Sequence, residues 1–108
     1  MLPSEIVKQI AQLTAENNKG AEALYEAEVK LAHAENELDL VEQRAFIKAE
    51  GTVADRTALA RLEAADSRLQ RDLRKAEANR IRVKIKALES ALMAAGTQAR
   101  LIQTEIKL

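Results

Sequence analysis

One stretch decides the fold of this chain: KAEGTVADR, residues 48–56. Gly51 can adopt the left-handed backbone conformation that ends a helix, and Thr52 can cap the helix that follows. Asp55 comes three residues after Thr52, which is the spacing of a capping box. A connection this short forces its two flanking helices to run antiparallel. The stretch therefore predicts an α-helical hairpin that turns at Gly51.

The chain before this turn has the pattern of one long helix. Pro3 marks its start, and Ser4 is the expected N-cap. Apolar or small residues then recur with alternating spacings of four and three, which is typical of a coiled-coil seam. They are Ile6, Ile10, Leu13, Asn17, Gly20, Leu24, Ala27, Leu31, Ala34, Leu38, Val41 and Ala45. The stretch 17–20 weakens this seam, and it either ends a short first helix or leaves a soft point in a continuous one.

The chain after the turn carries two apolar stripes in succession. The first comprises Leu59, Leu62, Asp66, Leu69, Leu73, Ala76, Arg80 and Val83. Folding about the turn predicts that this stripe packs on the first arm, with Val41 near Leu59 and Leu62. After about residue 80 the strongest stripe moves by one position, which rotates the apolar face by about 100°. It comprises Ile81, Ile85, Leu88, Leu92, Ala95, Ala99, Ile102 and Ile106.

These patterns predict an all-α fold, a long antiparallel, coiled-coil-like helical hairpin with a C-terminal oligomerisation helix. A single domain is expected, with one arm at about 4–50, a turn at 51–54, a second arm at about 55–95 and a C-terminal helix at about 97–108 that restarts at Gly96–Thr97. A two-helix core is marginal alone because it buries little apolar surface. We therefore expect a homo-oligomer, held by Ile81, Ile85, Leu88, Leu92, Ile102 and Ile106.

The composition excludes several classes of protein. The 108 residues include no cysteine, one histidine and two aromatic residues, and they are dominated by helix formers. An enzyme of this length normally needs loops and converging polar groups, so we expect neither catalysis nor a cofactor. The chain has no run of about 18 uncharged apolar residues and no signal-peptide pattern at its start. We therefore expect a cytoplasmic protein that does not contact a membrane.

The zero net charge conceals a strong asymmetry between the two arms. Residues 1–54 hold five basic and ten acidic residues, whereas residues 55–108 hold twelve basic and seven acidic ones. Residues 68–86 alone carry eight basic and two acidic residues. Arg61, Arg68, Lys75 and Arg82 recur at seven-residue intervals, which places them on one outward-facing ridge. On the first arm, Glu28, Glu35 and Glu42 recur with the same interval.

The basic ridge has three interpretations. It can pair with the acidic residues of the first arm, within one subunit or between subunits. It can follow the backbone of a nucleic acid by neutralising phosphates. It can also bind an acidic protein or an anionic small molecule. For the nucleic-acid interpretation, the candidate binding residues are Arg61, Arg68, Arg71, Arg74, Lys75, Arg82 and Lys86.

The other polar and aromatic residues suggest no chemistry. His33 has no second histidine or cysteine to complete a metal site, so a surface histidine is expected and no metal is bound. Tyr25 and Phe46 each follow a seam residue, which favours packing over base stacking. If the protein binds nucleic acid, its contacts are therefore expected mainly at phosphates, independent of sequence and sensitive to salt.

A family resemblance covers residues 50–106. The turn KAEGTVADR resembles that of small helical proteins encoded in phage recombination modules, and the charged helix after it is similar to that of the UvsY-type recombination mediators of T-even phages. The residues that carry the similarity are Ala65, Asp66, Leu69, Asp72, Ala91, Leu92, Arg100 and Ile102. The resemblance implies an oligomeric, non-enzymatic accessory protein that binds single-stranded DNA and helps to load a recombinase in place of a single-strand-binding protein. It also implies action in the cytosol of a phage-infected bacterium.

Three functional hypotheses follow. The first is a phage-type recombination mediator that binds single-stranded DNA through the basic ridge, with a recombinase or a single-strand-binding protein as a further partner. The second is a structural or adaptor coiled coil whose basic ridge pairs with the acidic residues of a neighbouring subunit. The third is a small phage inhibitor of a host protein.

Overall fold

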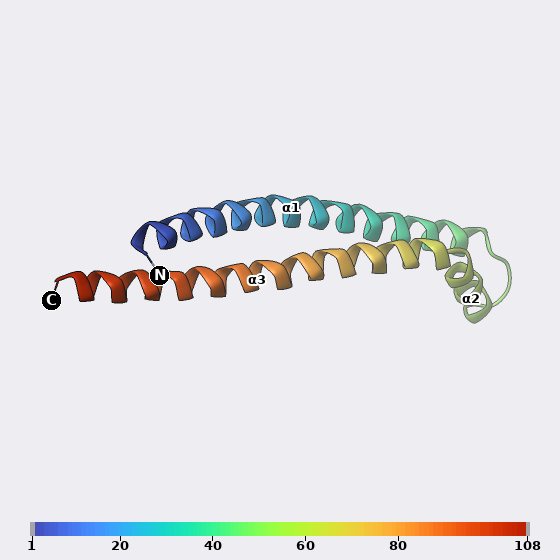
Figure 1. Cartoon of the computed structure of the whole chain (residues 1–108). Helices are drawn as coiled ribbons and strands as arrows, with labels where there is room; N and C mark the ends of the chain where they lie inside the picture. The colour runs from blue at the N-terminus through green and yellow to red at the C-terminus, as the bar shows by residue number, and fades with distance from the viewer. Residues whose placement is uncertain (1, 108) are drawn as a thin grey trace. The chain divides into compact units, whose positions relative to one another are not determined.

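A computed structural model of the protein describes residues 2–107. It contains three helices, α1 (Pro3–Lys48), α2 (Val53–Glu63) and α3 (Ala65–Lys107), and the described residues include no strand (Figure 1). The first helix begins at Pro3 rather than after Ser4, because Leu2 supplies the carbonyl that accepts from the backbone N–H of Glu5 at 3.0 Å. A proline in the first helical position costs nothing, since its missing N–H would have no helical acceptor.

The chain divides into two compact units. Unit 1 joins the residues up to Leu24 with those from Arg80 onward, and unit 2 comprises Tyr25–Asn79. In each unit, a segment of α1 runs antiparallel to a segment of α3 (Figure 1). The short helix α2 and the connection between α1 and α2 belong to unit 2. The predicted all-α antiparallel hairpin is therefore confirmed.

The positive φ of Gly51 and the capping box predicted for the turn between α1 and α2 are both present, although α1 ends at Lys48, before Gly51. Gly51 has a φ of +113°, a conformation that side chains with a Cβ rarely adopt. The backbone N–H of Asp55 donates to Thr52 Oγ1 at 3.1 Å, and the backbone N–H of Thr52 donates to Asp55 Oδ2 at 3.4 Å. The capping box is thus complete, and α2 starts directly after Thr52.

Arg56 ties the start of α2 to the end of α1. Its Nε and Nη2 atoms donate to the carbonyl oxygen of Phe46 at 3.2 and 3.0 Å. Its guanidinium carbon also lies 4.2 Å from the centroid of the Phe46 ring. Phe46 lies in the last turn of α1, where carbonyls lack helical donors. Arg56 therefore supplies the missing donors and adds a cation–π contact.

Of the two alternatives left open for residues 17–20 the continuous helix is observed, and the helix restart expected at Gly96–Thr97 does not occur. Helix α1 continues through residues 17–20, because Gly20 serves the packing of unit 1 instead of ending the helix. A Cβ at Gly20 would lie only 3.0 Å from Cγ1 of Ile85. Helix α3 continues through Gly96 and Thr97, and the Thr97 hydroxyl donates to the carbonyl of Met93 at 3.1 Å rather than capping a new helix.

The second arm breaks instead at Ala64, between α2 and α3. This residue has φ −87° and ψ 5°, and its N–H donates to the carbonyls of Ala60 and Leu62. It is fully buried. No glycine or proline lies between residues 52 and 95, so no local breaker marks this position in the sequence.

The predicted seam of α1 is confirmed. Each of its twelve positions is buried or half-buried, and Ile6, Ala27, Leu38 and Ala45 are the most enclosed. In contrast, the polar positions beside it, such as Glu28 and Glu35, are exposed. In each unit, one face of the α1 segment is thus its packed face.

The expected pairing of the second arm is wrong. All eight residues of its first stripe are exposed, with Leu62 at 73%, and Leu69 and Leu73 at 54% each. The face that packs on α1 lies on the other side of α2 and α3. Its residues are Ala60, Ala64, Ser67, Arg71, Arg74, Ala78, Ile81, Ile85, Leu88, Leu92, Ala95, Ala99 and Ile102, all buried or half-buried.

This pairing follows from the competition between the two stripes. From Ser67 to Ile102 the observed seam keeps the alternating four–three spacing without interruption. It includes the large aliphatic residues of the C-terminal half. It also places small residues such as Ala78 and Ala64 against α1, where they allow the two helices to approach closely. Full burial of a large aliphatic side chain contributes about 1.5–3 kcal/mol, and these half-buried side chains contribute a part of that. The leucines of the first stripe are left outside as a consequence.

The residues expected to hold an oligomer are therefore placed differently. Ile81, Ile85, Leu88, Leu92 and Ile102 are half-buried on the face of α3 that packs on α1 of the same chain. They do not form a separate, rotated face. Only Ile106 of that set is exposed, at 72%.

The two helical glycines of unit 1 are expected to respond differently to substitution. Gly96→Ala should stabilise the protein by about 0.5–1 kcal/mol, because alanine favours a helix and nothing lies within 4 Å of a Cβ at this position. Gly20→Ala should be less stable than Gly96→Ala by about 1 kcal/mol, because its Cβ must displace Ile85. Urea unfolding followed by circular dichroism, at one protein concentration, measures both. Equal stabilisation by the two variants would contradict the close packing at Gly20.

Candidate nucleic-acid interface

The candidate basic residues separate into two groups. Arg61, Lys75 and Lys86 are exposed on α2 and α3. Arg68, Arg71, Arg74 and Arg82 are half-buried, because the observed seam runs along or beside them. The exposed members can meet a ligand without rearrangement, whereas the half-buried members also contribute to packing.

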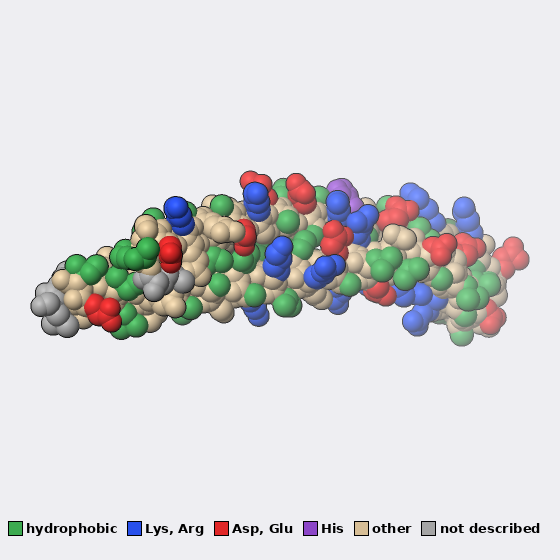
Figure 2. Space-filling view, in the orientation of Figure 1, with side chains coloured by type: hydrophobic (Ala, Val, Ile, Leu, Met, Phe, Trp, Pro, Cys, Tyr) green, Lys and Arg blue, Asp and Glu red, His purple; other side chains and the backbone are tan. Residues whose placement is uncertain are grey.

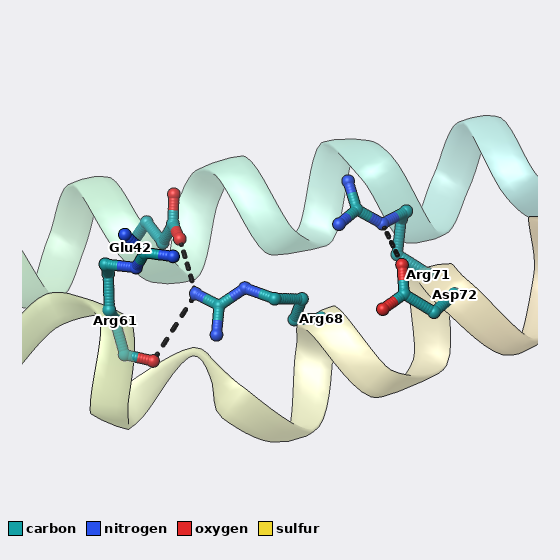
Figure 3. Close-up of polar contacts among 5 residues, drawn as sticks. All are labelled: Glu42, Arg61, Arg68, Arg71 and Asp72. Atoms are coloured by element: carbon teal, nitrogen blue, oxygen red, sulfur yellow. Dashed lines mark hydrogen bonds and ion pairs between the residues drawn. The ribbon is translucent and has the colours of Figure 1, made fainter.

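Arg68 is paired within the chain. Its Nη2 atom lies 2.9 Å from Oε1 of Glu42 on α1, and their side chains are 29% and 37% exposed (Figure 3). The same nitrogen also donates to the carbonyl of Arg61 at 3.5 Å. One residue of the acidic series on the first arm is thus bound to one residue of the basic ridge, as the pairing interpretation predicts within a subunit. Glu35 and Lys75 occupy the equivalent positions one heptad further along unit 2.

Two further arginines bind acidic neighbours on α3. Nε of Arg71 lies 2.7 Å from Oδ1 of Asp72 (Figure 3), and Nη1 of Arg74 lies 3.4 Å from Oε2 of Glu77. All four side chains are about one-third exposed or more. Ion pairs of this kind contribute about 0–1 kcal/mol and weaken with salt. These two pairs therefore hold the arginine side chains only weakly.

A groove in unit 2 gathers cations from both arms. Lys30, His33 and Asn36 of α1 face Gln70 and Arg74 of α3 across an open space of about 440 Å³. Ala34 and Glu37 complete the lining. On the face drawn in Figure 2, the histidine lies among both basic and acidic side chains. Three basic side chains and two side-chain amides thus surround this groove, against a single carboxylate.

The grouping of Lys30 and His33 with Arg74 was not predicted from the sequence. The two α1 residues are three positions apart and so share one helix face, which is a signal that the sequence does contain. Their approach to Arg74, however, depends on the face that α3 turns toward α1. The sequence pattern favours the first stripe, which includes Leu69 and Leu73, for the α3 face that packs on α1.

The two aromatic residues have different surroundings. Phe46 is half-buried beneath Arg56, as expected for a packing residue. Tyr25 is 69% exposed, although packing was expected for it too. Neither residue lies on α2 or α3, which carry the candidate basic residues. These two helices therefore offer no tyrosine or phenylalanine ring on which a base could stack.

Other kinds of site find little support. The His, Asp and Glu residues within 2–107 form no group of three that could hold a metal ion. No helix in this range is both long and apolar enough to cross a membrane. Comparisons of the chain with protein-family models, curated proteins and solved structures find no match.

Proposed function

We propose that the protein is a non-enzymatic accessory protein that binds the backbone of single-stranded DNA, in the role of a recombination mediator that assists recombinase loading. The groove that brings Lys30 and His33 of α1 next to Arg74 of α3 carries this proposal. The exposed ridge residues Arg61 and Lys75 add two cations to the same unit. The resemblance of residues 50–106 to phage mediators supports single strands as the ligand.

The chemistry of these residues favours phosphate contacts over base recognition. Lysine and arginine donate charge-assisted hydrogen bonds to phosphate oxygens, and each phosphate that is neutralised releases counterions. Neither Tyr25 nor Phe46 lines the groove, so the proposal rests on phosphate contacts and not on base stacking. Binding is therefore expected to be independent of sequence and to weaken steeply as salt rises.

The proposal is tested with a fluorescently labelled single-stranded oligonucleotide, followed by anisotropy at low and at physiological salt with duplex DNA as competitor. We expect the variant Lys30→Glu/Lys75→Glu to bind at least about tenfold more weakly, and to lower the log–log salt slope by about 2. Both side chains are exposed, so helicity should persist. Arg68 is left unchanged because its substitution would also break the ion pair with Glu42.

The matched control is Lys8→Glu/Lys19→Glu, which changes the net charge equally at two exposed positions of unit 1. It should alter the affinity by less than about twofold. If both double variants lost the same affinity for DNA, the DNA would be attracted by the net charge of the protein and not by a particular site. Absence of binding by the unchanged protein at low salt would overturn the proposal.

A second function is favoured by the ion pair between Arg68 and Glu42. This contact shows that acidic and basic residues of the two arms complement each other. It supports an adaptor or structural coiled coil in which the basic ridge serves pairing alone. In that case neither charge variant changes DNA binding, and Glu42→Lys destabilises the fold of unit 2.

A further inference from the structure

A second pocket of unit 2 lies between α2 and the last two turns of α1. It has a volume of about 260 Å³ and shares no lining residue with the groove that holds Arg74. Its lining residues are Glu42, Gln43, Phe46, Thr57, Ala60 and Arg61. Because drug-sized ligands occupy pockets of about 300–1,000 Å³, a pocket of this size fits a single small group.

The most buried residues of this pocket are apolar. Ala60 is 4% exposed, and Phe46 is half-buried. Arg56 lies against the Phe46 ring, but it is not among the residues that line the pocket. The part of the ring that lines the pocket is thus open to a ligand. A planar group that packs against this ring gains a contact that a phosphate alone cannot make.

The pocket also carries a cation without a carboxylate partner. Figure 3 shows the ion pair of Arg68 with Glu42 beside Arg61, and no dashed line ends at the Arg61 guanidinium. Among the described residues, the Arg61 side chain forms no ion pair, whereas each of the three arginines that follow it along the chain binds a carboxylate. The Arg61 guanidinium is therefore available to an anion such as the phosphate of a nucleotide.

The other polar groups of the pocket do not cancel this charge. Glu42 lines the pocket, but its Oε1 atom lies 2.9 Å from Nη2 of Arg68, which offsets its negative charge. The Thr57 hydroxyl donates to the carbonyl of Val53 at 2.8 Å, so toward a ligand it can only accept. Gln43 is exposed and offers both a donor and an acceptor. The pocket thus combines an aromatic ring, an available guanidinium and neutral hydrogen-bonding groups.

We propose that this pocket takes one unpaired base of a bound DNA strand, which packs on Phe46 while Arg61 binds the phosphate of the same nucleotide. The inference rests on the proposed function and adds one stacked base to the phosphate contacts of the groove. Every base has a flat face, so binding stays independent of sequence. A duplex cannot offer a base to the pocket without unpairing it. The pocket therefore predicts a preference for single strands.

The first test compares a labelled single-stranded oligonucleotide with inorganic polyphosphate, an anion without bases, used as its competitor. We expect Phe46→Leu to bind the oligonucleotide at least about fivefold more weakly, and polyphosphate within about twofold of the unchanged protein. Leucine keeps an apolar side chain here, and its carbonyl can still accept from Arg56. Tyr25→Leu is the matched control, since Tyr25 is 69% exposed on α1 in the same unit and lies outside the pocket.

The outcomes separate this inference from the proposed function. If Phe46→Leu and Tyr25→Leu bound the oligonucleotide equally well, the stacked base would be wrong and the phosphate contacts would stand. An equal loss of affinity for both ligands in Phe46→Leu would show that the ring supports only the fold, which also overturns the inference. If the unchanged protein bound no oligonucleotide at low salt, both proposals would fail.

The role of Arg61 is tested by the salt dependence of oligonucleotide binding. Arg61→Gln should lower the log–log salt slope by about 1, because it removes one phosphate contact. Arg61 is exposed, so the fold should persist. Lys48→Gln is the matched control, at an exposed position of α1 outside the pocket, and it should leave the slope unchanged. The same slope in both variants would exclude a phosphate at Arg61.

A measurement on the unchanged chain does not depend on how Phe46→Leu folds. An oligonucleotide that carries iododeoxyuridine is irradiated in the complex, and mass spectrometry identifies the crosslinked residue, which we expect to be Phe46 or another residue of the pocket. The chain has one tyrosine and no tryptophan, so its intrinsic fluorescence reports directly on Tyr25. A crosslink at Tyr25 instead of the pocket, with quenching of its fluorescence, would overturn the inference.

Discussion

Replacing Ala78 by leucine is expected to lower the free energy of unfolding by about 2–3 kcal/mol. Ala78 is completely buried on the α3 face that packs on α1, and Ala27 of α1 is 97% buried in the same unit. The alternation of small residues along this seam lets the two helices approach closely. A leucine at this position has no space, so the helices must separate or the side chain must take a strained rotamer.

Urea unfolding of Ala78→Leu, at the protein concentration used for the unchanged chain, measures this loss. The matched control is Ala32→Leu, an exposed position on α1 in the same unit, where the change should stay within about 0.5 kcal/mol. If the two substitutions had equal effects, close packing at Ala78 would be wrong. An increase in stability for Ala78→Leu would point to an unfilled space in the seam.

Removing the Arg56 side chain is expected to have a similar effect, of about 2 kcal/mol for Arg56→Ala. Two hydrogen bonds to the Phe46 carbonyl and the contact with the Phe46 ring are lost together. The carbonyl is left in the last turn of α1 without a donor from the protein. The junction of α1 and α2 should therefore loosen before the rest of unit 2 unfolds.

Arg56→Lys separates the effect of charge from that of geometry. Lysine keeps the positive charge near the α1 C-terminus, but it lacks the planar fork that donates twice to one carbonyl. We expect it to recover less than half of the stability lost in Arg56→Ala, as measured by thermal unfolding. Hydrogen exchange at the end of α1 should rise in both variants. Full recovery by lysine would show that charge alone matters.

The parts of the fold that depend on neighbouring residues could be predicted from the sequence. Gly51, Thr52 and Asp55 lie within five residues of one another, and each has a conformational preference that does not depend on distant packing. The seam of α1 was also predictable, because this helix carries a single apolar stripe of the required spacing. A helix with only one apolar face can pack in only one way.

The pairing of α3 could not be predicted in the same way, because this helix carries two stripes. Local spacing favours Leu69 and Leu73 as strongly as Ile81 and Ile85, and only the total area buried against α1 decides between them. The break at Ala64 has no local signal either. It lies at a buried alanine in a run that contains no glycine or proline.

The candidate site shows the same division. The periodic ridge of Arg61, Arg68 and Lys75 could be read from spacing alone, and a pairing with the acidic residues of the first arm was one expected outcome. The groove that joins His33 to Arg74 required the relative rotation of two helices. Residues elsewhere on α3 determine that rotation. The grouping of His33 with Arg74 could therefore not be predicted from the spacing of these residues.

The antiparallel course of α1 and α3 also sets the order in which contacts can form. Glu42 and Arg68 are separated by 26 residues of chain, so the loop that their contact closes is short. The contact between Gly20 and Ile85 closes a loop about two and a half times longer, at a higher entropic cost. Because the shorter loop costs less entropy to close, we expect contacts near the Gly51 turn to form before those near the ends of the helices.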